Sequence, residues 1–67
     1  MPSFTPIRAV ERAIDVLAAL NRSPVCTLDT LHRQTGIPKP TLIRLLETLE
    51  GKGLVTRAPQ YGAYSLT

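Results

Sequence analysis

The sequence has few cysteines, histidines and aromatic residues, and each shortage excludes a kind of small protein. The one cysteine, Cys26, cannot form a disulfide within the chain, so the bridges that stabilise many small secreted domains are excluded. Cys26 and the single histidine, His32, fall short of the four ligands that a structural zinc site usually needs. The three aromatic residues, Phe4, Tyr61 and Tyr64, are too few for a surface on which single-stranded nucleic acid stacks.

The sequence also lacks the signals of membrane insertion, secretion and catalysis. No apolar run approaches the ~20 residues that cross a membrane, and the N-terminus has no basic start followed by an apolar stretch. There is no glycine-rich phosphate-binding loop, and no nucleophile has a base at a suitable spacing. We therefore expect a cytoplasmic protein with no cofactor, no bound metal, no membrane association and no enzymatic activity.

What the sequence does contain describes one small basic domain. The chain has 67 residues, of which 43% are hydrophobic, and a chain of this length buries about 60% of its unfolded surface on folding. Eight lysines and arginines against five acidic residues leave a net charge of +3. A charge of this sign favours a polyanionic partner.

The first apolar periodicity begins at Ile7, after a flexible tail that we predict for residues 1–6. It predicts a helix over residues 7–21, which ends before Pro24 because proline cannot continue a helix. The residues expected to be buried have the spacing i, i+3, i+4, i+7 and i+10 of one helix face. They are Val10, Ala13, Ile14, Leu17 and Leu20.

Two further helices are predicted on either side of a tight turn at residues 36–38. The first of them starts at Thr27, whose hydroxyl can cap the exposed amides, and closes at Gly36. In the next helix, over about residues 39–51, Lys39 is expected to be the cap and Pro40 the first helical residue. Its core face is Leu42, Leu45, Leu46 and Leu49, and Ile37 is expected to fill the core beneath the turn.

The end of the chain is predicted to form a β-hairpin. Strands are expected over residues 54–57 and 63–66, with turn residues at 59–62 between them. Two helices joined by a glycine turn form a helix-turn-helix, and a hairpin directly after the second of them is a wing. The predicted fold is therefore mainly α with a small β-hairpin, a winged helix-turn-helix of three helices and a two-stranded wing over residues 7–67.

The middle of the chain carries a family resemblance. Residues 28–49 read LDTLHRQTGIPKPTLIRLLETL. This run resembles the DNA-binding domain of IclR-family (isocitrate lyase regulator) transcriptional regulators, whose pattern is close to LxxLAxxxGLPKSTVxRLLxTL. Residues 53–55 and 64–66 resemble its wing, and Arg12 matches an arginine common in its first helix. His32 stands where the family usually has alanine, and Pro40 stands where it usually has serine.

The resemblance implies a bacterial transcription regulator that binds double-stranded DNA. It implies a homodimer or dimer of dimers on a palindromic operator. It also implies a larger C-terminal domain, absent from this chain, that binds a small organic acid or aromatic catabolite as effector. The family includes both repressors and activators.

The third predicted helix has the hydrogen-bonding groups that a helix in the major groove needs near its N-terminus. Arg44 is expected to bond a guanine, whereas Ile43 either packs on a thymine methyl or lines the rim of the core. Lys39 and Thr41 are placed to hold phosphates. At position 40, proline removes an amide and a hydroxyl that would otherwise be available to a phosphate.

Other expected DNA contacts lie outside that helix. Thr27 offers backbone amides to a second phosphate, and Arg57 in the wing, about residues 54–66, reaches the flanking backbone or minor groove. Arg12 either contacts DNA or pairs with Asp15. The predicted DNA-binding residues are Arg12, Thr27, Lys39, Pro40, Thr41, Ile43, Arg44, Thr48 and Arg57.

Some residues have more than one interpretation. A winged helix can also be a protein-interaction module without DNA binding, and Ile7, Val16 and Ile43, off the predicted core stripes, would then form its apolar surface. Cys26 is expected to be a buried small hydrophobe, with a redox sensor as the alternative. His32 is expected to be packed or half-exposed.

Overall fold

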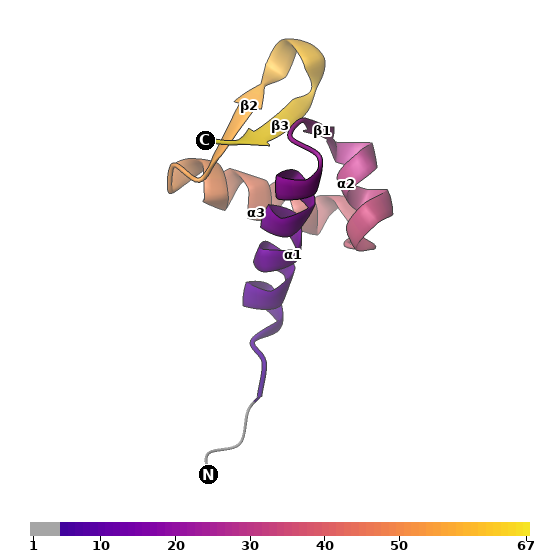
Figure 1. Cartoon of the computed structure of the whole chain (residues 1–67). Coiled ribbons are helices and arrows are strands. Elements are labelled where there is room, and N and C mark those ends of the chain that lie inside the picture. The colour runs from indigo at the N-terminus through magenta and orange to yellow at the C-terminus, as the bar shows by residue number, and fades with distance from the viewer. Residues whose placement is uncertain (1–4) are drawn as a thin grey trace.

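In the computed structural model, which describes residues 5–67, three α-helices pack with a small antiparallel sheet (Figure 1). Residues 1–4 of the predicted tail lie outside the described residues, and Thr5 and Pro6 are exposed and in neither helix nor strand. The elements in chain order are α1 (Arg8–Arg22), β1 (Cys26–Thr27), α2 (Leu28–Thr35), α3 (Lys39–Gly51), β2 (Val55–Ala58), a short 3-10 turn (Pro59–Tyr61) and β3 (Ala63–Leu66).

Helix α1 has all of its fully buried residues in its C-terminal half. Its buried residues are Val16, Ala19 and Leu20. The N-terminal half projects beyond the other elements (Figure 1), which leaves Val10 51% and Ile14 57% exposed. Their predicted place in the core is therefore wrong. Val16, predicted to lie off the core stripe, is fully buried, so the true stripe is rotated around the helix from the predicted one.

The cap of α2 is confirmed. The Thr30 amide donates a hydrogen bond to Thr27 Oγ1 over 3.2 Å. Gly36 ends the helix with a φ of 72°, a left-handed conformation that residues with a Cβ rarely adopt.

Side chains of α2 hold the turn that follows it. The Ile37 amide donates to Thr35 Oγ1 over 3.2 Å, and that hydroxyl donates to the Leu31 carbonyl over 2.7 Å. His32 Nδ1 lies 2.7 Å from the Ile37 carbonyl, which can only accept, so Nδ1 donates this hydrogen bond. Ile37 itself is buried in the core, as predicted.

Helix α3 begins one residue earlier than the sequence predicts. Pro38 is the N-cap and Lys39 the first helical residue, so Lys39 is not the cap and Pro40 is the second helical residue. Proline costs no hydrogen bond there, because amides of the first turn have no partner within the helix. Leu42, Leu46 and Leu49 are buried, and Leu45 is half-buried against the core.

The sheet contains one strand that the sequence analysis missed. Strands β2 and β3 form the predicted hairpin, shifted by one residue at β2, and β1 pairs with the other edge of β3 to give the order β1-β3-β2. Strand β1 is only two residues long, too short for an alternating pattern to reveal it. It joins the start of α2 to the wing, because Cys26 and Thr27 pair with Tyr64 and Ala63.

The core lies between the helices and the sheet. It includes Cys26, whose thiol donates a hydrogen bond to the Ser23 carbonyl. Burial raises the pKa of the Cys26 thiol, which favours the unreactive form over the thiolate of a redox sensor. Within residues 5–67, no helix has the length and apolar character to cross a membrane.

Two positions on α3 test how far stability depends on the core. We expect Leu46→Ala to lower the free energy of unfolding by about 2–5 kcal/mol. A core of this size supplies roughly 3–5 kcal/mol, so urea unfolding followed by circular dichroism at 25 °C should show the loss of a large part of the stability of the domain. The control Ile43→Ala changes the 40% exposed neighbour on the same helix and should change stability by less than about 1 kcal/mol. Equal losses in both variants would contradict this arrangement of α3.

Candidate nucleic-acid interface

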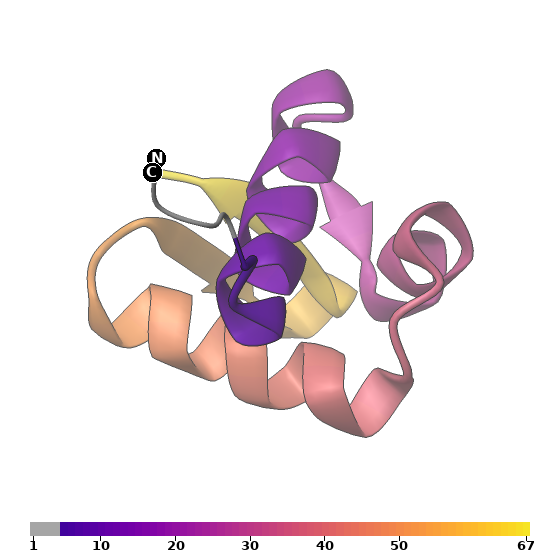
Figure 2. The same cartoon turned by 90° about the horizontal axis from the view of Figure 1, so that it is seen from below.

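Helix α3 buries its leucine face in the core and leaves its opposite face exposed to a partner. Ile43, Arg44, Glu47 and Thr48 are exposed, and successive residues turn about 100° around the axis from the buried leucines. Near the N-terminus, Lys39 and Pro40 are exposed and Thr41 is half-buried. The predicted residues of this helix are thus gathered along one side. Figure 2 shows α3 at the edge of the molecule.

The side chains on this face differ in how much hydrogen-bonding capacity they keep. Thr48 Oγ1 donates to the Arg44 carbonyl over 2.8 Å, so its hydroxyl proton is already used and its oxygen remains an acceptor. The guanidinium of Arg44 has no ion-pair partner within residues 5–67. Arg44 can therefore present a flat fork of donors to a ligand.

Lys39 is paired with an acidic residue of α2, a contact that the sequence did not predict. Its ammonium forms an ion pair with Asp29 in the first turn of α2, and α2 lies beside the N-terminal end of α3 (Figure 2). The hydrogen bond and charge of Lys39 hold the pKa of the Asp29 carboxyl below its ordinary value. A phosphate at this point must compete with Asp29 for the ammonium.

Thr27 has little side-chain capacity left for a ligand. Its hydroxyl accepts from the Thr30 amide and donates to Thr30 Oγ1 over 3.0 Å. Only backbone groups at the start of α2 remain for the contact that the sequence predicts there.

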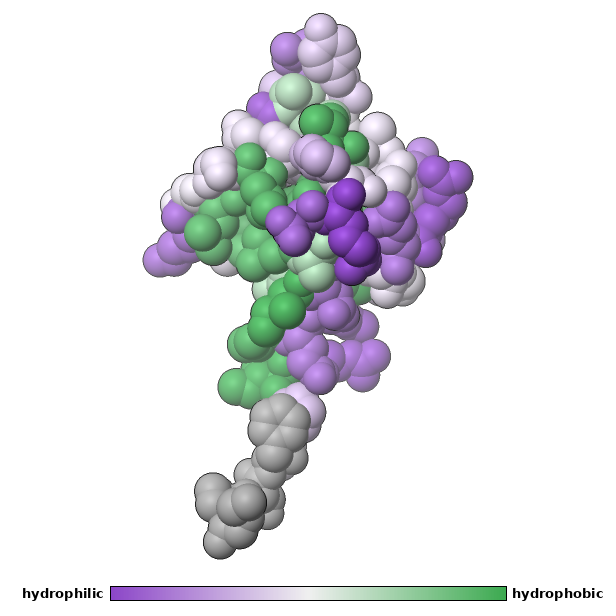
Figure 3. Space-filling model, in the orientation of Figure 1, coloured by the Kyte–Doolittle hydropathy of each residue, from purple (hydrophilic) through white to green (hydrophobic). Residues whose placement is uncertain are grey.

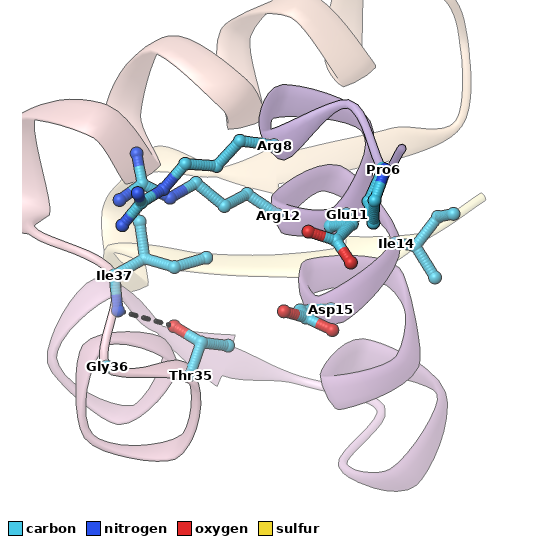
Figure 4. Close-up of a pocket in the computed structure, with 9 residues that line it drawn as sticks. All are labelled: Pro6, Arg8, Glu11, Arg12, Ile14, Asp15, Thr35, Gly36 and Ile37. Atoms are coloured by element: carbon cyan, nitrogen blue, oxygen red, sulfur yellow. Dashed lines mark hydrogen bonds between the residues drawn. The ribbon is translucent and has the colours of Figure 1, made fainter. Parts of the chain in front are cut away.

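Arg12 lies on α1, in a groove between α1 and the turn at residues 35–37. We call this the α1 groove; among the residues that line it are Arg8, Arg12, Thr35 and Ile37 (Figure 4). Arg12 is half-buried, and the alternative pairing with Asp15 is not among the ion pairs of the described residues.

The remaining predicted contact, Arg57, lies in the wing. It is exposed on β2 opposite Tyr64 of β3, and directly opposite residues share one face of a sheet. In Figure 1 the wing and the free half of α1 extend in opposite directions from the body. The predicted site residues thus fall into three groups, on α3 and the start of α2, in the α1 groove, and on the wing.

The described residues contain no group of three or more histidine, cysteine, aspartate or glutamate side chains placed to hold a metal. The three groups of predicted site residues present exposed cationic and hydrogen-bonding side chains to a partner. Such a surface suits reversible binding of an anionic polymer.

Comparison with known proteins identifies the family. The family model "IclR helix-turn-helix domain" matches residues 9–59. An IclR transcriptional regulator from Alicyclobacillus acidocaldarius has a structure similar to this chain, with 34% identity and a TM-score of 0.88; the match covers 92% of this chain and 26% of that one. An IclR-family regulator from Rhodococcus sp. matches with 34% identity and a TM-score of 0.76, over 98% of this chain and 27% of that one.

A more distant protein shares the fold alone. The Zα domain of Carassius auratus PKZ, solved in complex with Z-DNA, matches with 16% identity and a TM-score of 0.85, over 91% of this chain and all (100%) of that one. No curated protein sequence matches the chain.

The chain spans about a quarter of the length of the two regulators. The family match covers most of α1, both helices of the helix-turn-helix and β2, so it includes the exposed face of α3. The chain belongs to the IclR helix-turn-helix domain family, a family of DNA-binding domains of transcription regulators.

Proposed function

We propose that this domain recognises a specific sequence in double-stranded DNA, with α3 in the major groove, as the DNA-binding part of a bacterial transcription regulator. The observation that carries the proposal is the division of α3 into a buried leucine face and an exposed face with Ile43, Arg44 and Thr48. The major groove, about 12 Å wide, admits one helix presenting such a face.

Within this arrangement each side chain on α3 has a distinct task. Arg44 donates two hydrogen bonds to a guanine, a contact worth about 1–3 kcal/mol of discrimination against a wrong base. Ile43 packs on a thymine methyl, and Thr48 accepts a hydrogen bond from a base or a bridging water. These contacts read sequence, whereas contacts to phosphates set the position of the helix.

The phosphate contacts surround α3. Lys39 and Thr41 hold one phosphate at its N-terminus, next to Pro40, which packs against the sugar-phosphate backbone without a hydrogen bond. Backbone amides near Thr27 hold a second phosphate. Arg57 extends from the wing to the flanking backbone or minor groove, and Arg12 reaches the backbone from α1.

We further propose that two copies bind a palindromic operator. The free half of α1 exposes Ile7 (67%), Val10 (51%) and Ile14 (57%), and Figure 3 shows hydrophobic atoms along one side of this half. A second copy is the partner that such an apolar strip suits, since operator symmetry mirrors the two-fold symmetry of a dimer. The effector, a small organic acid or aromatic catabolite, would bind a C-terminal domain, and the regulator would act in the cytoplasm.

Sequence recognition by Arg44 can be tested by selection from random duplexes. Wild-type protein should enrich a motif that contains guanine at a defined position. Arg44→Ala should lose that guanine preference and bind the selected duplex about 5- to 150-fold more weakly, the range that 1–3 kcal/mol implies.

The matched control for Arg44 is Arg33→Ala, an exposed arginine on α2. It should leave the selected motif unchanged. The proposal that α3 recognises the DNA sequence through Arg44 would be refuted by either of two results. The Arg44→Ala protein could select the same motif, or wild-type protein could enrich no motif.

If Lys39 leaves Asp29 to hold a phosphate, as proposed, the pKa of the Asp29 carboxyl should change when DNA binds. The pKa of Asp29 is lowered in the free domain, so its ion pair stabilises the fold fully above the ordinary aspartate pKa and stops doing so as pH falls through the lower value. When DNA takes Lys39, the pKa should rise toward or above the ordinary value, which carbon-detected NMR of the carboxyl can follow.

Two variants serve as references for the pKa of Asp29. Lys39→Gln should raise the pKa of Asp29 without DNA, whereas Lys52→Gln, at the other end of α3, should not. A pKa of Asp29 that stays low in the complex would mean that Lys39 remains on Asp29 and holds no phosphate.

The dimer can be tested by sedimentation at increasing protein concentration. We expect wild-type domain to self-associate and Ile14→Gln to weaken association about tenfold or more, because a buried apolar side chain is worth roughly 1.5–3 kcal/mol. The control Tyr61→Gln changes an apolar residue of the wing that is even more exposed, 75% against 57% for Ile14, and should leave association unchanged. A domain that stays monomeric at millimolar concentration would contradict assembly through this half of α1.

A further inference from the structure

The free half of α1 has a second face, which the proposed function uses only at Arg12. Residues four apart lie on the same face of a helix, one turn or about 6 Å along the axis. Arg8 and Arg12 have this spacing, and Figure 3 shows hydrophilic atoms along the side of α1 opposite the apolar strip. The helix is therefore amphipathic beyond the point where it leaves the core.

Both arginines are directed into the α1 groove. They line it together with Thr35, Gly36 and Ile37 of the turn that leads into α3. Figure 4 shows the two side chains extending from α1 toward this turn, while the carboxylates of Glu11 and Asp15 point to another part of the groove. The two guanidinium groups thus share one side of the groove.

Neither the Arg8 nor the Arg12 guanidinium forms an ion pair with another of residues 5–67, although Glu11 and Asp15 line the same groove. Two like charges placed together repel each other, and an anion between them relieves that repulsion. Arginine forks match the paired oxygens of carboxylates and phosphates, and the DNA proposed as the partner of α3 supplies phosphates.

We propose that Arg8 and Arg12 form a two-arginine site for one phosphate group in the α1 groove. This inference rests on the proposed function, in which the phosphate belongs to the DNA backbone beside the segment that α3 reads. Ile37 lines the groove and comes two residues before Lys39 in the chain, so the site would continue the phosphate contacts of the N-terminus of α3 onto α1. Arg8 thereby becomes a DNA-binding residue, and α1 positions the domain on the duplex.

The test compares salt dependence of binding to a random-sequence duplex. Each lost phosphate contact lowers the slope of log affinity against log salt by about 0.9, which is about eightfold in affinity between 1 M and 0.1 M salt. Arg8→Gln and Arg12→Gln should each lower the slope by up to about 0.9 on every sequence, and the double variant should lower it by no more than about 0.9, because the two arginines hold one phosphate. Arg22→Gln removes the same charge from the other, C-terminal end of α1 and should leave the slope unchanged.

Two further measurements separate this site from the proposed function. If Arg44→Ala loses sequence preference while Arg8→Gln behaves like Arg22→Gln, α3 reads DNA and the two-arginine site is refuted. If the wild-type domain binds no duplex, titration with inorganic phosphate tests whether the site takes free phosphate instead. Shifts of the Arg8 and Arg12 side-chain NMR signals, lost in Arg8→Gln, would support a site for free phosphate, and no shifts would overturn it.

Loss of folding is controlled in the same samples. Arg8 is exposed in the first turn of α1, outside the core, so Arg8→Gln should keep the circular dichroism spectrum and melting temperature of the wild-type domain. A folded Arg8→Gln protein with an unchanged salt slope would refute the proposal.

Discussion

Burial of the leucines on one face of α3 is the constraint on which the rest of the structure depends. Leu42, Leu46 and Leu49 lie in the core, and each buried side chain of this size is worth roughly 1.5–3 kcal/mol. Turning α3 about its axis to expose another face would lose that energy. The side chains between the leucines, among them Ile43 and Arg44, are therefore held toward solvent in a fixed direction.

The turn before α3 fixes where this face lies relative to the rest of the domain. Gly36 supplies the left-handed conformation, Thr35 and His32 hydrogen-bond to the backbone on either side, and Ile37 anchors the turn in the core. The Asp29–Lys39 ion pair joins the first turns of α2 and α3 at the surface. These contacts make the two helices a unit with one geometry, which is what a groove-binding surface requires.

Local signals in the sequence were enough to predict the helices, the turn and the hairpin. Thr27 and Gly36 mark the ends of α2 through their own chemistry, and the leucines of α3 have an unambiguous period. The sequence did not show that α1 extends past its neighbours. Val10 and Ile14 therefore looked like core residues, whereas Val16 takes that place. Strand β1 exists only because β3 lies beside it, and no pattern within two residues encodes such pairing.

For the interface, a sequence motif can place Arg44 and Lys39 on a helix but cannot show what each side chain contacts. The pairing of Lys39 with Asp29 and the shared groove of Arg8 and Arg12 depend on how separate elements pack. The most direct test is NMR of the ¹⁵N-labelled domain during addition of a DNA duplex. The account predicts the largest shift changes along residues 39–48 and at the wing around Arg57. Changes confined to the apolar side of α1, with α3 unaffected, would contradict it.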